Sequence, residues 1–223
     1  RLVGSEMCIR DSLKSEYVFA HAYYASSFDK GGKTSYMEDI TRAFLDGRKL
    51  ITSANGEKLT DAQRSELMGY VAIISENWQK VIAESVFKYA GSTYKSLVAL
   101  EDVSNDDLAK EFGKYMKYWG ELKGFSMALQ VGKDNIGESA TKLNRMIGFG
   151  PILMDETQII GIDSKGNYIM DKIYSMNDAK LHMLKIQKLM IDEFGVEAKS
   201  NDMLADMADL ASKIGTSESA END

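Results

Sequence analysis

Side chains that commonly bind metals or act as nucleophiles are scarce in this chain. It has two histidines, His21 and His182, and a single cysteine, Cys8. Zinc motifs on helices place a glutamate or a second histidine three or four residues from the first histidine, and neither histidine has such a neighbour. We therefore expect both to be ordinary core or surface residues. The sequence predicts no metal site and no bound cofactor.

Adjacent carboxylates are the next candidates for chemistry, because two acids in different environments can act as acid and base. Three such pairs are Asp106-Asp107, Asp155-Glu156 and Asp192-Glu193. We interpret them as helix-end or surface charges, because their spacing singles out none of them. The sequence therefore predicts no catalytic residue and favours a non-enzymatic protein.

The segment from Asp163 to Asn167 has a faint similarity to a calcium loop. Such a loop needs oxygen ligands at alternate positions and a terminal glutamate that binds through both oxygens. Here Lys165 stands at a ligand position and the glutamate is absent. We expect a turn.

The charge balance limits the partners of this protein. Its 27 basic and 34 acidic residues give a formal net charge of −7. Binding to a phosphate backbone needs clustered basic residues, so we expect no nucleic-acid partner. No apolar run approaches the roughly 20 residues that cross a bilayer, so we expect no transmembrane segment here. A small ligand or an envelope protein remains as the expected partner.

Apolar residues recur every three or four positions along most of the chain, which predicts an all-α fold. A single proline in 223 residues permits long helices. We expect a bundle of long antiparallel helices over residues 13–28, 35–53, 61–90, 104–131, 138–147, 177–194 and 202–214. We expect Gly91 to end or bend the third of these helices, and a small hairpin or irregular excursion near 155–171.

Both ends of the chain are expected to lie outside the helical domain, which covers residues 13–214. Residues 1–12 include LVGSEMCIRD, which matches ten consecutive codons of a transposon-type sequencing adapter, so we interpret them as foreign. Residues 215–223 are polar and acidic, which predicts a disordered tail. Because Cys8 lies in the foreign segment, the rest of the chain has no cysteine, which suits an exported protein.

Two longer motifs carry a more specific signal. Residues 43–51 read AFLDGRKLI and residues 118–130 read YWGELKGFSMALQ. They resemble the AFxxGRxxI and [HY]WxExKGFxxxLQ motifs of the bacterial domain of unknown function 4856 family, and the similarity extends over roughly residues 37–195. The resemblance implies an all-helical, exported and often lipid-anchored protein, loosely similar to the imelysin-like proteins connected with iron acquisition. It also implies that this chain is the C-terminal part of a larger domain.

The resemblance leaves three functions open. The first is a non-enzymatic binding protein of the periplasm or outer membrane, in iron or nutrient uptake. The second is an imelysin-like metallopeptidase whose metal motif lies in an upstream half. The third is a structural or protein-interaction module, for which we expect an exposed apolar face on the last helix.

The polar residues of the two motifs are the candidate binding residues: Arg48, Tyr118, Glu121 and Lys123. A glycine inside a helix costs about 1 kcal/mol relative to alanine, so Gly47 and Gly124 are expected where another helix crosses closely. If the two motifs meet there, Arg48 and Glu121 form an ion pair. The alternative is two independent surface charges. Trp78 and Trp119, on the apolar faces of the two longest helices, are expected to be largely buried.

Overall fold

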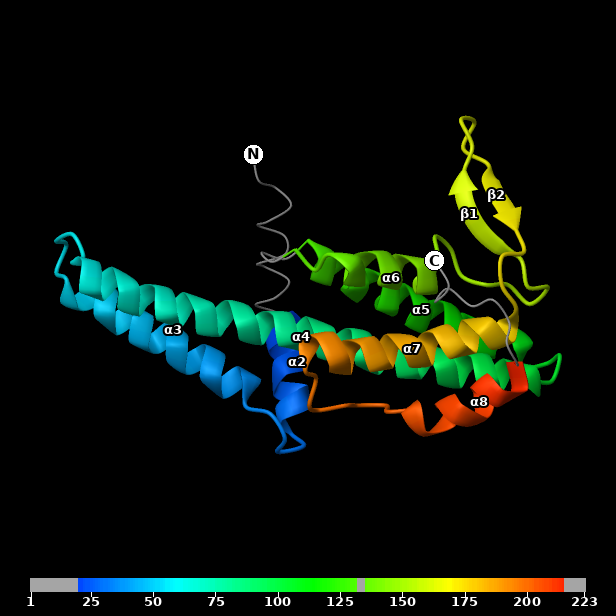
Figure 1. Ribbon diagram of the computed structural model, residues 1–223, viewed down its shortest axis with the longest axis horizontal. Coiled ribbons are helices and arrows are strands. Elements are labelled where there is room, and N and C mark those ends of the chain that lie inside the picture. Colours follow the sequence, from blue (N-terminus) through cyan, green and yellow to red (C-terminus); the bar gives the residue numbers. More distant parts are fainter. Residues whose placement is uncertain (1–19, 132–134, 215–223) are drawn as a thin grey trace. The chain divides into compact units, whose positions relative to one another are not determined.

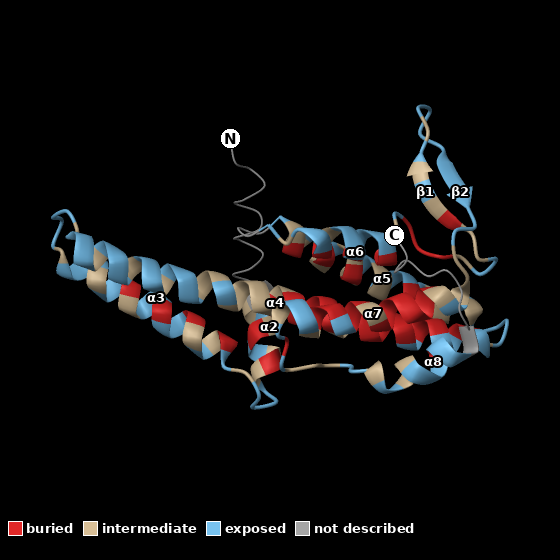
Figure 2. Cartoon of the chain, viewed as in Figure 1, coloured by how far each residue is buried: buried red, intermediate tan, exposed pale blue. Residues whose placement is uncertain are grey.

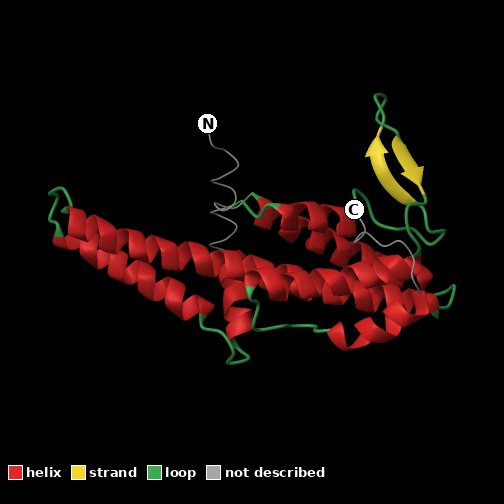
Figure 3. Cartoon of the chain, viewed as in Figure 1, coloured by secondary structure: helices red, strands yellow, loops and turns green. Residues whose placement is uncertain are grey.

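The computed structural model describes residues 20–131 and 135–214. It confirms an all-α protein with one small excursion (Figures 1 and 3). The elements are α2 (Ala20–Asp29), α3 (Tyr36–Ser53), α4 (Asp61–Glu101), α5 (Leu108–Gln130), α6 (Glu138–Ile147), β1 (Gln158–Ile162), β2 (Tyr168–Asp171), α7 (Met176–Phe194), the 3-10 turn η1 (Leu204–Asp206) and α8 (Met207–Ile214). The predictions for residues 1–12 and 215–223 lie outside the described residues.

The chain divides into two compact units, residues 1–82 and 83–223, and the boundary falls inside α4. In the first unit, α3 packs on α2 and on the first part of α4. Ile40 and Ala43 of α3 are buried. A side-chain carbon built on Gly47 would lie 3.4 Å from Leu67 and 3.7 Å from Tyr70. Gly47 therefore faces α4 within this unit.

The start of α3 is capped by the helix before it. One carboxylate oxygen of Asp29, the last residue of α2, accepts a hydrogen bond from the backbone N–H of Tyr36 (2.9 Å), and the other accepts from Met37 (2.8 Å). The Thr34 hydroxyl also donates to Asp29 (2.7 Å). A carboxylate is favourable here because the first N–H groups of a helix lack internal partners and carry partial positive charge.

Helix α4 does not end at Gly91, so the prediction that this glycine stops the helix is wrong. The helix continues to Glu101. The glycine is needed for packing, because a side-chain carbon on Gly91 would lie 2.0 Å from the carbonyl oxygen of Asn201. The Ser92 and Thr93 hydroxyls donate back to carbonyls one turn earlier in α4, at 3.0 and 2.8 Å.

The core of the second unit is formed mainly by α7 and the second part of α4, where buried residues are concentrated (Figure 2). Helix α7 also contacts α6 and α8. Its N-cap is Ser175 rather than the expected Asn177, and Ser175 and Asp178 form a capping box. Gly195 has the left-handed conformation expected at the C-terminal end.

A two-stranded antiparallel hairpin, β1 and β2, occupies the region near 155–171 where the sequence predicted a hairpin or an irregular excursion. Its tip is the expected turn, in which Asp163 accepts hydrogen bonds from the backbone N–H groups of Lys165 and Asn167, both at 2.8 Å. The Asn167 side-chain amide also donates to Asp163 (3.0 Å); this bond is the largest cause of the lowered pKa of Asp163, and the backbone bonds lower it further. The whole of β2 is exposed. By contrast, Leu210 of α8 is buried, so this apolar side chain of the last helix is covered.

Candidate functional site

The second motif anchors the C-terminal end of α6. The Trp119 indole N–H donates to the carbonyl oxygen of Ile147 (3.1 Å), and the Lys123 ammonium donates to that of Gly148 (2.5 Å). The two donors lie one turn apart on α5, so they reach neighbouring carbonyls at a helix end that lacks internal partners. Burial lowers the pKa of Lys123. Trp119 and Lys123 therefore have a structural role in this unit.

We expect Trp119→Phe and Lys123→Met each to destabilise the protein by about 1 kcal/mol, because each removes one donor from a helix end. Urea unfolding followed by circular dichroism measures this. Lys142→Met, at an exposed position on α6, is the control and should change the free energy of unfolding by less than about 0.5 kcal/mol. Equal stability of all three variants would contradict the assignment.

Tyr118 and Glu121 lie beside α4 in the second unit. The Tyr118 ring is 6.3 Å from the Tyr89 ring, which stacks on Phe125 at 5.5 Å. Burial lowers the pKa of Lys88, and the carboxylate of Glu121 partly offsets this effect. The negative charge of the half-buried Glu121 therefore favours the charged form of Lys88.

The two motif glycines, Gly47 and Gly124, have different surroundings. Gly47 faces Leu67 and Tyr70 of its own unit, whereas a side-chain carbon on Gly124 would meet nothing within 4 Å in the described part of the chain. Gly124 therefore has no close packing partner within its own unit, and its crossing with α3 stays a prediction. Arg48 is exposed on α3, and its pairing with Glu121 stays a prediction.

Neither tryptophan belongs to the buried core, and Trp78 and Trp119 are both only partly buried. For Trp119 the reason is visible in its hydrogen bond. An indole that donates to a helix-end carbonyl lies at the rim of the core, where its ring is apolar on one side and its N–H meets a polar group.

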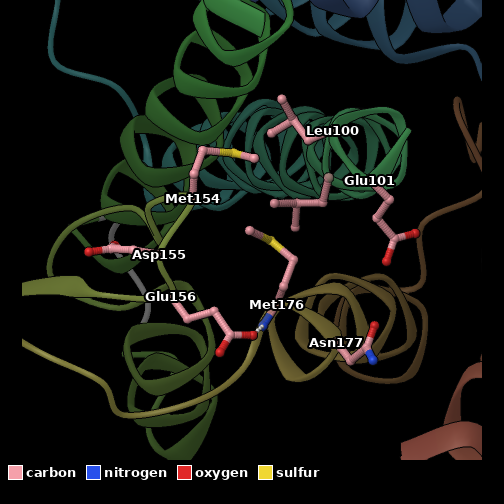
Figure 4. Close-up of a pocket in the computed structure, with 8 residues that line it drawn as sticks. Leu100, Glu101, Met154, Asp155, Glu156, Met176 and Asn177 are labelled. Carbon is pink, nitrogen blue, oxygen red and sulfur yellow. Dashed lines mark hydrogen bonds between the residues drawn. The ribbon is translucent and has the colours of Figure 1, made fainter. Parts of the chain in front are cut away.

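A cavity of about 550 Å³ lies elsewhere in the second unit (Figure 4). Its volume falls in the range of about 300–1,000 Å³ that is typical of small-molecule sites. Three segments form it, which are the C-terminal end of α4, the loop before β1 and the first turn of α7. The lining residues are Leu97, Leu100, Glu101, Met154, Asp155, Glu156, Met176 and Asn177.

One wall of the cavity carries an ion pair. Glu101, at the end of α4, pairs with Lys180 of α7. The Lys180 side chain is only 6% exposed and that of Glu101 is 46% exposed. A buried ammonium needs such a partner, so Lys180 holds the Glu101 carboxylate at the cavity while the outer part of this carboxylate remains accessible.

The opposite wall carries Glu156, whose backbone has the left-handed conformation (φ +65°) that non-glycine residues rarely adopt. This conformation places its carboxylate at the start of α7, where it accepts a hydrogen bond from the backbone N–H of Met176 (3.1 Å). The buried Gln158 holds the loop by donating to the carbonyls of Glu156 (2.9 Å) and Tyr174 (3.0 Å). Glu156 is therefore fixed by its neighbours.

Asp155 differs from the other two acids of the cavity. Its carboxylate accepts hydrogen bonds from the Thr157 hydroxyl (2.7 Å) and backbone N–H (3.1 Å). These bonds lower its pKa, with the hydroxyl as the largest cause. Figure 4 shows the Asp155 side chain pointing away from the centre of the cavity. Two carboxylates, those of Glu101 and Glu156, therefore remain to face a ligand.

Sequence reasoning named the pair Asp155-Glu156 but did not recognise it as part of a site. The cavity combines residues 97–101, 154–156 and 176–177, and no motif spacing connects segments so far apart. The left-handed backbone of Glu156 also has no signal in a glutamate. None of the candidate binding residues Arg48, Tyr118, Glu121 and Lys123 lines this cavity.

His182 is a buried histidine of α7, 3% exposed, and its ring meets the edge of Tyr174 at 4.9 Å. Its Nδ1 atom has no hydrogen-bond partner among the described residues. Burial, helped by the positive charge of Lys185 and opposed by the Asp178 carboxylate, lowers the pKa of His182 to about 4. The imidazole is therefore neutral at neutral pH.

We expect His182 to make the protein less stable in acid. Between about pH 6.5 and pH 4 the unfolded chain protonates this histidine while the folded chain does not, so stability falls as the pH falls through this window. The full loss is about 3 kcal/mol at about 1.4 kcal/mol per pKa unit. In urea unfolding at several pH values, the free energy of unfolding should change less with pH for His182→Phe, which keeps an aromatic ring, than for the wild-type protein. An identical pH dependence of the free energy of unfolding in both proteins would contradict the expectation.

No group of three or more His, Cys, Asp or Glu residues suited to a metal ion occurs within residues 20–131 and 135–214. Over the same residues, no helix has the length and apolarity of a membrane span. A scan of protein families, a search of curated proteins and a search of solved structures gave no match. The relation to the domain of unknown function 4856 family therefore stays a proposal.

Proposed function

We propose that this chain is a non-enzymatic binding protein, and that its site for a small molecule is the cavity between α4, α7 and the loop before β1. The observation that carries the proposal is the cavity itself, of about 550 Å³, with a lining that is half apolar and half polar by residue. Small-molecule sites combine apolar walls with a few fixed polar groups in this way.

The chemistry of the lining supports binding over catalysis. The eight lining residues include no serine, threonine, cysteine, histidine or lysine, so carboxylates are the only groups among them that could act as nucleophile or general base. The acids serve as structural partners, because Glu101 pairs with Lys180 and Glu156 caps α7. Fixed polar groups of this kind orient a ligand without reacting with it.

We extend the proposal to an exported protein of the bacterial periplasm or outer membrane that takes part in iron or nutrient uptake. Two features support this setting. The two motifs at residues 43–51 and 118–130 resemble those of an exported family. The one cysteine of the chain, Cys8, lies in the segment that we interpret as foreign, so the rest of the chain has none, which suits an exported protein.

A thermal-shift screen with cationic, anionic and neutral small molecules tests the proposal. At saturating concentration a ligand that binds only the folded state raises Tm. Asn177→Trp places a large side chain at an exposed position of the cavity lining and should abolish the shift.

Glu193→Trp is the matched control, since it puts the same side chain at an exposed position near the other end of α7. This variant should keep the shift. If no compound raises Tm in the wild-type protein, or if Asn177→Trp responds as the wild-type protein does, the cavity is not the site.

A further inference from the structure

The two carboxylates that face the cavity lie on different walls. Glu101 projects from the end of α4, and Glu156 projects from the loop before β1 (Figure 4). Figure 4 also shows Met176 between them, with Leu100 and Met154 on another side of the cavity. The cavity therefore has an acidic group on either side of an apolar middle.

Each carboxylate can accept more bonds than its neighbours supply. An ionised carboxylate has two oxygens and about four acceptor sites. Glu101 and Glu156 each use Oε1 for the Lys180 ammonium and the Met176 N–H respectively. Either group can therefore also accept a hydrogen bond from a ligand N–H.

The electrostatics of the cavity disfavour an anion. The start of α7 would attract negative charge, but the carboxylates of Glu156 and Asp178 already accept hydrogen bonds there. Lys180 is paired with Glu101 and nearly buried. Since the lining itself contains three acids and no basic residue, a positively charged ligand is favoured.

The apolar middle excludes a simple inorganic cation as the best occupant. Leu97, Leu100, Met154 and Met176 supply the apolar surface. Thioether and aliphatic groups do not replace the hydration shell of a hard cation, but they pack well against methylene groups, and methionine adapts its shape to them.

We infer that the cavity binds a linear diammonium compound, with one ammonium group at Glu101, the other at Glu156 and the methylene chain along the leucines and methionines. This inference rests on the proposed function, because it names the ligand class of the same cavity. Charge-assisted hydrogen bonds at both ends set the orientation, and the apolar middle selects the length of the chain.

Isothermal titration calorimetry with diaminoalkanes of increasing length tests the inference, with monoamines and diols of matched length as comparisons. We expect one chain length to bind best, and the monoamine of that length to bind about tenfold more weakly because it lacks one charge-assisted bond. Binding should also weaken with added salt, because the ends of the cavity are accessible to solvent ions.

Two substitutions locate the ends. Glu101→Gln and Glu156→Gln keep the size of the side chain and an acceptor oxygen but remove the charge, so each should weaken the diamine about tenfold and reduce its advantage over the monoamine. Glu193→Gln, at an exposed position of α7, removes one charge outside the cavity and should leave both affinities unchanged. Circular dichroism confirms that each variant is folded.

The outcomes separate this inference from the proposed function. If a monoamine, a diol or an anion binds as tightly as any diamine and Asn177→Trp abolishes that binding, the diammonium inference is wrong and the binding site stands. If diamines bind equally well to Glu101→Gln, Glu156→Gln and Asn177→Trp, or do not bind at all, the inference is overturned. The proposed function falls with it only when the thermal-shift screen also gives no ligand that depends on Asn177.

Discussion

Gly91→Ala is expected to lower the free energy of unfolding by about 3–5 kcal/mol, because the new methyl group has no space. It would lie 2.0 Å from the carbonyl oxygen of Asn201 and 2.6 Å from Nε2 of Gln187. That amide donates to the carbonyls of Asn201 (2.8 Å) and Phe87 (3.0 Å). Moving the loop away would break bonds of a fully buried side chain, and denaturant unfolding measures the loss.

Gly124→Ala is the matched control, because its methyl group would meet nothing within 4 Å in the described part of the chain. Alanine is the better helix former, so this variant should be more stable by about 0.5–1 kcal/mol. A destabilised Gly124→Ala variant would support the packing role that the sequence predicted for this glycine. A neutral Gly91→Ala variant would mean that the loop at Asn201 contributes little to stability.

Glu84→Ala is the second large effect that we expect, again about 3–5 kcal/mol. Glu84 is fully buried, and its carboxylate accepts backbone hydrogen bonds from Glu197 (2.6 Å), Ala198 (2.6 Å) and Lys199 (3.1 Å). Hydrogen bonds to a charged group are worth about 1.5–3 kcal/mol each, and partners left unpaired add to the loss. Urea unfolding gives the global effect, and hydrogen exchange at residues 197–199 gives the local one.

Two further variants define what the carboxylate contributes. Glu84→Gln keeps one acceptor oxygen and should cost about half as much. Glu76→Ala, at an exposed position of the same helix, should stay within about 0.5 kcal/mol of the wild-type protein. If Glu84→Ala matches Glu76→Ala in stability and exchange, the buried carboxylate does not hold the loop.

The sequence predicted most helices because local signals define them. Gln63 and Thr60 form the expected capping box at the start of α4, with bonds of 2.9 and 3.3 Å. The predicted range of α6 matches the structure residue for residue. The failure at Gly91 has a tertiary cause, since a glycine required by a distant carbonyl and a glycine that ends a helix look the same in sequence.

The candidate site could not be predicted in the same way. The motif residues Trp119 and Lys123 serve α6, and the cavity depends on residues without any motif. Glu156 reaches the cavity through a left-handed backbone conformation that ordinarily marks glycine or asparagine. Such a site becomes visible only when segments that are distant in sequence are placed together.

The buried Glu84 carboxylate of α4 also has a consequence for synthesis on the ribosome. Glu84 and the backbone N–H of Lys199 are separated by 115 positions, which take roughly 6–23 s to translate at about 5–20 residues per second. During that interval the second part of α4 lacks the loop and the helix that cover it, so its apolar surface and its carboxylate face solvent together. Contacts of such long sequence separation form late, and this nascent surface is the one on which we expect a chaperone to act.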